Sequence, residues 1–309
     1  MPLTPKPCAA QSRDVCPAEA LEYAPTSRRL LCSLCHSAEG YPYRKLGINW
    51  VYRCPACAFL YAPATCEPTR LYAELYDNSP TYQQLLAPRV HGKRKRGMAY
   101  CEAWFFRRFP KPFGTGRLLE VGCGSGNFLE LAAKKGWQVV GVEIAPRAAR
   151  IAQERGFDVF VGSLQEYVAS GPKPLATVTT AFEVLEHVPD PAMFLRDIAS
   201  ATAPGGLVIA STPNARDPFM WRDPRPETHP PVHLCFFTAK TLQRALLNAG
   251  LQPREIRTNF LPRGSMRQVV RQRWLRNLLR LPVVVLRLAG LLDGNQLVAI
   301  ARRPLKPAA

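Results

Sequence analysis

A glycine-rich turn between a predicted strand and a predicted helix carries the clearest chemical signal in the sequence. Glu120-Val-Gly-Cys-Gly-Ser-Gly126 follows the strand-like run 117–119 and precedes the helix-like run 127–133. Glycines at such a turn let a ligand approach bare backbone, and the first N–H groups of the helix point at that ligand. Glu143 ends the next strand-like run, where a carboxylate can accept hydrogen bonds from both hydroxyls of a ribose. These residues predict a site for a nucleoside-containing cofactor.

The spacing of the glycines distinguishes this turn from a dinucleotide site. The dinucleotide fingerprint reads G-x-G-x-x-G, whereas here the third glycine, Gly126, comes one residue early. With Glu120 two residues before Gly122, the pattern resembles motif I of the class I S-adenosylmethionine (SAM) methyltransferases, E/D-x-G-x-G-x-G. The resemblance implies that the turn lies under the methionine and ribose of SAM, and that Glu143 binds the ribose. From the glycines alone, a tight turn without a ligand is the alternative.

Three further segments carry the resemblance, which covers residues 117–251. Residues 182–191, Phe-Glu-Val-Leu-Glu-His-Val-Pro-Asp-Pro, resemble the end of the family's fourth strand, beside SAM and acceptor. Residues 204–214 resemble the turn and fifth strand. Residues 233–238, His-Leu-Cys-Phe-Phe-Thr, resemble the entry to the next helix in small-molecule and lipid methyltransferases similar to those of ubiquinone biosynthesis. The resemblance implies an α/β fold with a seven-stranded Rossmann-like sheet, closed by an antiparallel hairpin.

One position departs from the family pattern. The family often has an aspartate after its third strand to hold the adenine amino group, whereas Ser163 stands there in this chain. We expect the Ser163 hydroxyl and the backbone N–H of Leu164 to contact adenine instead. The residues that the resemblance assigns to the cofactor are Glu120, Gly122, Cys123, Gly124, Gly126, Glu143, Ile144, Ser163, Leu164, Phe182 and Glu183.

Two histidines are candidates for a general base. His187 and His233 lie in segments that the resemblance places at the pocket, and His229 is a weaker third candidate. A neutral imidazole can remove a proton from an acceptor hydroxyl or acidic carbon near physiological pH. The competing structural interpretation is that His187 caps the following helix and His233 anchors its loop. Glu183 and Glu186 could orient a histidine, contact the cofactor or supply charge at a helix start.

Four of the ten cysteines have the spacing of a metal site. They read Cys32-x2-Cys35-x18-Cys54-x2-Cys57, two knuckles that can place four thiolates tetrahedrally around Zn²⁺. The alternative is four buried cysteines without a metal. Because a four-thiolate site leaves no open position, we expect a structural zinc that stabilises a small ribbon. Similar ribbons precede the SAM domain in some bacterial methyltransferases, where they help cover the substrate side.

The motifs define an order along the chain. We expect a disordered leader at residues 1–27 and a zinc ribbon at 28–66. A helical lid and linker should follow at 67–112, and a SAM-binding domain at 113–309. Strands are expected near 118–121, 139–143, 159–161, 177–182 and 207–211, with helices near 128–135, 148–155, 192–201 and 239–249. The closing hairpin is expected at 255–259 and 296–301.

A basic insertion at residues 263–292 separates the two strands of that hairpin. It holds seven arginines and no acidic residue, with Trp274 and several leucines at helical intervals. One interpretation is a solvated helix that packs its leucines on the domain. A basic amphipathic helix can also lie on an anionic membrane. Nucleic-acid contact is a third interpretation, although no RNA-binding motif is visible.

Composition bounds the class of protein. The 309 residues are 47% hydrophobic and 21% charged, as in ordinary globular proteins, and carry a formal net charge of +18. That charge favours an anionic partner without choosing among lipid headgroups, a diphosphate and RNA. No uninterrupted apolar run is long enough to span a bilayer, and the N-terminus lacks an apolar signal core. We therefore expect a cytoplasmic protein, with peripheral contact at the inner membrane face as a variant.

The function that the resemblance implies is methyl transfer from SAM to a small-molecule acceptor, such as a sugar or an isoprenoid or lipid-linked compound. Two alternatives stay open. The high positive charge favours an RNA methyltransferase, and a non-catalytic SAM-binding scaffold would use the ribbon and the basic helix to bind partners.

Overall fold

The computed structural model of the chain describes residues 30–37, 39–86, 98–217, 220–222, 225–259 and 293–305. The leader predicted at residues 1–27 and the basic insertion predicted at residues 263–292 lie outside these residues, and so does the membrane contact predicted for the insertion. Within the described part, no helix is both long and apolar enough to cross a membrane.

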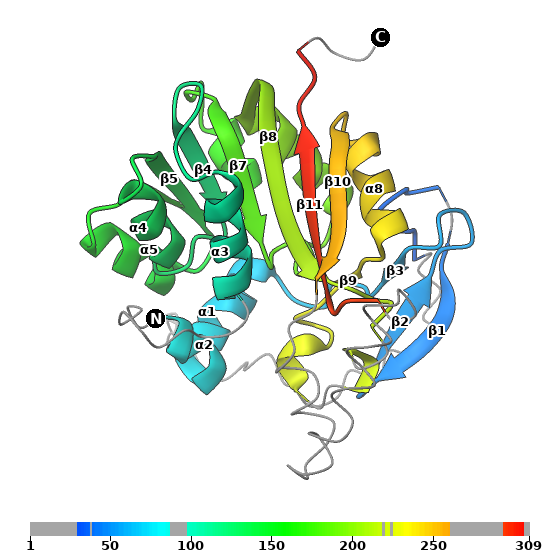
Figure 1. The fold of residues 1–309 in the computed structure, drawn as a ribbon. Coiled ribbons are helices and arrows are strands. Elements are labelled where there is room, and N and C mark those ends of the chain that lie inside the picture. Colours follow the sequence, from blue (N-terminus) through cyan, green and yellow to red (C-terminus); the bar gives the residue numbers. More distant parts are fainter. Residues whose placement is uncertain are drawn as a thin grey trace, which may run out of the picture.

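The predicted seven-stranded sheet is confirmed. Its strand order is β10-β11-β8-β7-β4-β5-β6 (Figure 1). The strands are β4 Arg117–Val121, β5 Gln138–Glu143, β6 Val159–Val161, β7 Ala176–Phe182, β8 Thr202–Pro213, β10 Gln252–Asn259 and β11 Gln296–Arg302. Strands β4 to β8 pair in parallel, and β11 joins β8 antiparallel before β10 pairs with it. The turn expected at residues 204–206 is a register shift within β8, which begins earlier than predicted.

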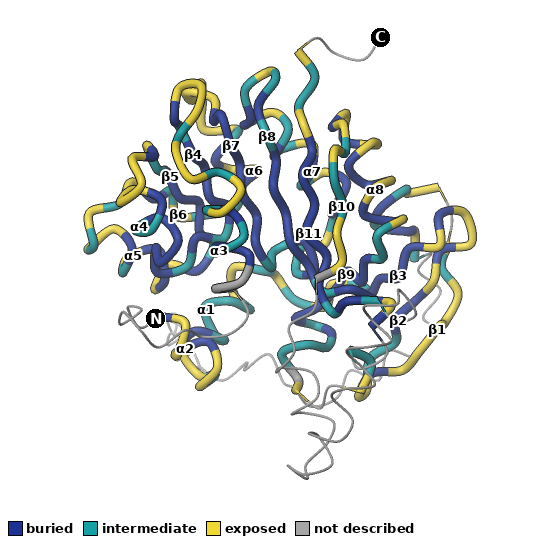
Figure 2. The backbone as a smooth tube through the Cα atoms, in the orientation of Figure 1, coloured by how far each residue is buried: buried dark blue, intermediate teal, exposed yellow. Residues whose placement is uncertain are grey.

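Both faces of the sheet are covered by helices. Successive side chains of a strand point to opposite faces, so Leu118 packs on one face with Phe105 and Phe128, and Leu119 packs on the other with Leu195 and Leu242. The first face carries α3 Met98–Arg108, α4 Asn127–Ala133 and α5 Pro146–Glu154; the second carries α6 Leu164–Ala169, α7 Pro191–Ala201 and α8 Ala239–Asn248. All seven residues of β7 are buried, as expected for a central parallel strand (Figure 2).

Two short helices precede the sheet in the sequence. They are α1 Pro68–Asn78 and α2 Pro80–Leu86, and they lie near the carboxyl ends of the parallel strands (Figure 1). Tyr76, Tyr82 and Leu86 pack with Ala145 and Ala148 at the start of α5. This packing places the two helices over the ends of β4 and β5.

A second sheet joins the cysteine-rich segment to the large domain. Its order is β1-β2-β3-β9, with bounds Tyr41–Leu46, Asn49–Arg53, Leu60–Tyr61 and Cys235–Phe236. The first three strands come from the predicted ribbon, whereas β9 comes from the 233–238 segment, for which the sequence predicted only a helix entry. Leu60 pairs with Phe236 and Tyr61 with Cys235. The ribbon is therefore continuous with the segment that carries His233.

Candidate active site

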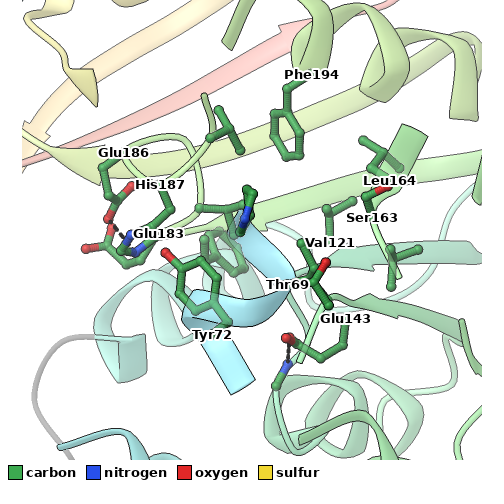
Figure 3. A pocket seen from close by; sticks show the side chains of 18 of the residues that line it. Thr69, Tyr72, Val121, Glu143, Ser163, Leu164, Glu183, Glu186, His187 and Phe194 are labelled. Atoms are coloured by element: carbon green, nitrogen blue, oxygen red, sulfur yellow. Dashed lines mark hydrogen bonds and ion pairs between the residues drawn. The ribbon is translucent and has the colours of Figure 1, made fainter. Parts of the chain in front are cut away.

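A large cavity opens at the carboxyl ends of β4, β5 and β7. Its volume is about 920 Å³, near the upper end of the range for ligand sites. Figure 3 shows its two ends: Glu143, Ser163 and Leu164 lie at one, and Glu183, Glu186, His187 and Tyr72 lie at the other. We call these the Glu143 end and the His187 end. The carboxyl edge of a parallel sheet is the usual place for a ligand site in this kind of fold.

The turn after β4 needs its glycines. Gly122, Gly124 and Gly126 have φ values of 74°, 55° and 77°, in the left-handed region that side chains disfavour. A Cβ at Gly122 would come within 2.6 Å of the Val184 side chain, and one at Gly126 within 2.9 Å of Phe157. The turn can therefore present bare backbone to the cavity while it packs closely on both neighbouring segments.

Glu143 fastens this turn from the end of β5. One carboxylate oxygen accepts a hydrogen bond from the Gly124 N–H at 2.8 Å, and the other accepts one from the Ala145 N–H at 2.9 Å. The side chain is 5% exposed, and burial raises the pKa of its carboxyl while these N–H groups lower it. Each oxygen keeps a lone pair with which it can accept a ligand hydroxyl.

The structure brings most of the predicted cofactor residues to the cavity. Those that line it are Gly122, Gly124, Glu143, Ile144, Ser163, Leu164, Phe182 and Glu183. Glu120, Cys123 and Gly126 do not line it. The Cys123 sulfur packs against Gly141 of β5, and Glu120 is 2% exposed within the sheet. These three residues shape the turn from behind.

Ser163 begins a helix that the sequence did not predict. Its hydroxyl accepts a hydrogen bond from the Glu166 N–H, and the Glu166 carboxylate accepts one from the Ser163 N–H, which forms a capping box at the start of α6. Six residues are too few for a clear helical periodicity, so only the Ser-x-x-Glu spacing could have revealed this helix. The cap holds Ser163 and Leu164 at the rim of the Glu143 end.

Glu183 has a strained backbone at the end of β7. Its φ is 55°, unusual for a residue with a side chain. The carboxylate accepts hydrogen bonds from the Ser211 hydroxyl and the Gln296 amide, both at 2.7 Å. Burial raises the pKa of this carboxyl, and the two donors oppose that rise. The backbone conformation and the two bonds fix Glu183 at the His187 end.

The two candidate bases lie side by side. The ring centroids of His187 and His233 are 4.8 Å apart. The Nδ1 atom of His187 lies 2.9 Å from the Val232 carbonyl, and since a carbonyl only accepts, this nitrogen carries the proton. The other nitrogen, Nε2, is then a free acceptor and lies 3.8 Å from a Glu186 oxygen. His229 does not line the cavity.

Burial keeps this cluster close to neutral. It lowers the pKa of His187 to about 4 and, helped by the nearby His187 and Arg225, lowers that of His233 well below its usual value. Burial and the neighbouring Glu183 raise the pKa of Glu186 well above the ordinary carboxyl range. The ligand atoms of Glu186, His187 and His233 all lie within 4.8 Å of one another, so they could also hold a metal ion. The arrangement can take up a proton or a cation.

The ribbon and the His187 end share main-chain hydrogen bonds. The N–H groups of Leu234 and Cys235 both donate to the Glu186 carbonyl, and the Ala62 N–H after β3 donates to the Leu234 carbonyl. His36, beside the first knuckle, pairs with Asp190 at 3.2 Å, and Asp190 caps α7. The ribbon therefore braces the backbone on both sides of the histidine pair.

The residues that sequence reasoning missed come from irregular or distant segments. Tyr72 and Tyr82 reach the cavity from α1 and α2, and Glu227 reaches it from a short 3-10 helix at Pro226–Thr228. The helical lid at residues 67–112 was expected in outline, but the residues on which it packs were not. Glu227 and Arg225 lie in a proline-rich stretch with no periodicity, so no sequence signal could have placed them.

Comparison with known proteins decides the family. The family model described as a methyltransferase domain matches residues 92–256, more than half of the chain. The chain belongs to this family. Its sheet, glycine turn and cavity are those of a class I SAM methyltransferase domain, as the sequence resemblance predicted.

The relatives of this methyltransferase domain match over part of their length. A ubiquinone biosynthesis O-methyltransferase of Albidiferax ferrireducens is 38% identical over 109 residues, which are 33% of this chain and 43% of that protein. One from Bordetella bronchiseptica is 41% identical over 105 residues and is likewise matched over 43% of its length. The match spans less than half of these relatives.

The methyltransferase domain also has structural neighbours with low sequence identity. A SAM-dependent methyltransferase from Archaeoglobus fulgidus has a TM-score of 0.51 at 21% identity, over 66% of this chain and 93% of that chain. The [4+2]-cyclase SpnF has a TM-score of 0.53 at 20% identity, over 79% and 99%. Because one neighbour is named for a cyclisation, these likenesses show the fold rather than the reaction.

The four sulfur atoms of the cysteine cluster lie within 4.8 Å of one another, close enough to share one metal ion. The sulfur atoms of Cys32 and Cys57 are 3.6 Å apart, and so are those of Cys35 and Cys54. A disulfide would need about 2.05 Å, whereas a tetrahedron with Zn–S bonds of about 2.3 Å has edges of about 3.8 Å. In each knuckle the residue after the second cysteine, His36 or Ala58, has positive φ and donates its N–H to the carbonyl of the first cysteine. The four sulfurs fit a zinc ion.

Proposed function

We propose that the protein transfers a methyl group from SAM to a small-molecule acceptor. The observation that carries this proposal is the continuous cavity of about 920 Å³, which joins the glycine turn to the Glu186–His187–His233 cluster. A cavity of this size has room for SAM and for a second molecule beside it. Only a continuous cavity lets an acceptor atom reach the methyl group in line with the breaking C–S bond.

The Glu143 end supplies groups suited to the nucleoside. Glu143 would accept hydrogen bonds from the ribose hydroxyls, and the Ser163 hydroxyl with the Leu164 N–H would contact adenine. The bare turn at Gly122 and Gly124 would lie under the methionine part. This orientation points the sulfonium methyl toward the His187 end.

The reaction needs positioning and one proton transfer. The sulfonium is already an activated donor, so holding the acceptor in line supplies much of the rate. The unprotonated Nε2 of His187 is the proposed proton acceptor, because the Val232 carbonyl holds the proton on Nδ1. His233, whose ring packs against His187, is the second candidate for the same task.

We also propose that the four cysteines bind a structural zinc ion. All four positions would be filled by thiolates, so the zinc would take no part in the methyl transfer. Its contribution would be to stabilise the ribbon, which is too short to build a large core alone.

The acceptor that the sequence suggested, a sugar or an isoprenoid or lipid-linked compound, stays part of this proposal. RNA methylation and a non-catalytic scaffold are the competing functions. Of the described residues that line the cavity, Arg225 is the only Lys or Arg, so this lining has little to attract a phosphate backbone.

The test is transfer of radiolabelled methyl from SAM into fractionated cell extract by the full chain. We expect label in a low-molecular-weight product, and none with Gly124→Arg, since an arginine side chain would fill the cavity beside the turn. RNase-sensitive label would favour RNA instead. SAM binding without label in any fraction would contradict methyl transfer and favour a scaffold.

A further inference from the structure

We propose that the acceptor is an amine, whose ammonium form is held by Glu186 between aromatic rings at the His187 end. This inference rests on the proposed methyl transfer and specifies its substrate class. The chain has a formal net charge of +18, yet the described lining of its cavity is rich in carboxyl groups.

The charge balance of the cavity is the first observation. Among the described lining residues, one is a cation, Arg225, and its side chain is exposed. The acidic lining residues are Glu67, Glu143, Glu166, Glu183, Glu186, Asp190, Asp197 and Glu227. Even with Glu143 assigned to the ribose, the lining strongly favours a cationic guest over an anionic one.

A buried carboxyl oxygen without a hydrogen-bond partner is the second observation. Glu186 is 2% exposed, lines the cavity, and its Oε2 atom has no hydrogen-bond partner. Burying such a group costs free energy unless a ligand satisfies it. Glu183, close by, already accepts from Ser211 and Gln296. The Oε2 atom of Glu186 is therefore the acceptor that is left to meet a ligand.

The walls around Glu186 are aromatic. Tyr72 and His187 meet edge to face with centroids 5.6 Å apart, and Tyr72 lies 6.2 Å from Tyr82. His233 closes the group at 4.8 Å from His187. Tyrosine faces attract ammonium groups through their ring quadrupoles, by about 2 kcal/mol when the site is dry. Rings around a carboxyl group, which a bound ammonium ion would hold in its charged form, fit an ammonium group better than a phosphate or carboxylate.

The protonation state of His187 suits an amine as the methyl acceptor. The Val232 carbonyl holds the proton of His187 on Nδ1, which leaves Nε2 free to accept one proton. An amine needs only to shed the proton that makes it an ammonium ion. That proton passes to Nε2 of His187, and the nitrogen lone pair attacks the methyl carbon. The C–S bond electrons return to sulfur, which leaves S-adenosylhomocysteine, an N-methylammonium product and a proton that His187 releases to solvent.

The test compares three probes of similar shape on the zinc-loaded full chain saturated with S-adenosylhomocysteine. They are benzylamine, benzyl alcohol and benzyl phosphate, and binding is measured by calorimetry. We expect benzylamine to bind about tenfold or more tightly than benzyl alcohol, and benzyl phosphate to bind most weakly. Equal binding of amine and alcohol, preferred binding of the phosphate, or no binding of benzylamine would overturn the inference.

A matched pair of variants locates the effect. Glu186→Gln should lower benzylamine affinity about tenfold or more and leave benzyl alcohol within about twofold, because only the ammonium loses a charge partner. Asp197→Asn, which neutralises a more exposed lining acid, should change benzylamine affinity by less than about threefold. Equal effects of the two variants would contradict a specific role for Glu186. Unchanged S-adenosylhomocysteine affinity shows that each variant is folded.

The labelled product separates this inference from the function on which it rests. Label in a product that a cation exchanger retains supports both. Label in a neutral or anionic product overturns the amine and leaves methyl transfer standing. If no product is labelled, methyl transfer fails, and the probe affinities still decide whether the His187 end prefers an ammonium group.

Discussion

The Glu143 side chain holds the glycine turn in place and also faces the cavity. Its two oxygens tie the Gly124 and Ala145 N–H groups, so they hold the glycine turn to the start of α5. The same oxygens face the cavity, where the ribose is proposed to lie. A change at Glu143 therefore affects the shape of the turn and the contact with the ligand together.

Glu143→Ala should weaken SAM binding at least about tenfold, since hydrogen bonds to a charged group contribute about 1.5–3 kcal/mol. Isothermal titration calorimetry measures the affinity. Glu154→Ala, on the exposed side of α5, is the control and should bind SAM as the unaltered chain does. Equal affinities of the Glu143 and Glu154 variants would place the nucleoside elsewhere.

His187 should stay neutral well below the pH at which an exposed histidine is charged. Burial lowers its pKa from 6.5 to about 4, and the groups that face it are Glu186, Tyr72 and His233. Nitrogen NMR at pH 5.5 should show a neutral ring with its proton on Nδ1. A charged imidazolium at that pH would contradict the geometry of the cluster.

The same lowered pKa has a consequence for stability. The unfolded state binds the proton at a higher pH than the folded state does, so the His187 contribution to the free energy of unfolding falls as pH drops from 6.5 toward about 4. His187→Asn should reduce this pH dependence, as measured by urea unfolding in the presence of zinc at matched pH values.

At the scale of elements, the ribbon and the His187 end are joined through β9. The strand pairs with β3, and its first residues hydrogen-bond the Glu186 carbonyl. The glycine turn and Glu143 belong to β4, α4 and β5, outside the ribbon sheet. Disrupting the ribbon should therefore disturb the acceptor side more than the SAM side.

Removal of zinc, by chelation or by Cys57→Ser, tests this separation. The native chain should hold about one zinc ion, as expected for one four-thiolate site. Without zinc, we expect methyl transfer to fall by about tenfold or more, because the backbone at the His187 end loses the support of the ribbon. SAM affinity should stay within about threefold. Cys66→Ser, outside the cluster, should change neither. An equal loss of SAM affinity would mean that the ribbon supports the whole domain.

At the scale of the whole molecule, local patterns were predictable and distant pairings were not. Short sequence patterns were enough to predict the strand-turn-helix at Glu120–Gly126, the acid at Glu143 and the two cysteine knuckles. The two-residue strands β3 and β9 have no periodicity, and their partners are far apart in the sequence. The lid depends on Tyr76 and Tyr82 meeting Ala145 and Ala148, which no spacing encodes.

The net charge of the whole molecule and the charge of the described cavity lining have opposite signs. A net charge of +18 suggested an anionic partner, yet the described cavity lining is acidic, with Arg225 as its one Lys or Arg. Composition counts charges over the entire chain, whereas recognition depends on those that the fold brings together. Only the folded arrangement places Glu183, Glu186 and Glu227 around one space.

The central claim is that one cavity holds SAM at the Glu143 end and the acceptor at the His187 end. A crystal structure of the zinc-loaded chain with S-adenosylhomocysteine tests it most directly. The account predicts ribose hydroxyls on Glu143, adenine beside Ser163 and Leu164, and the sulfur facing Glu186, His187 and His233. A nucleoside bound at the His187 end, or a sulfur that faces away from the two histidines, would contradict it.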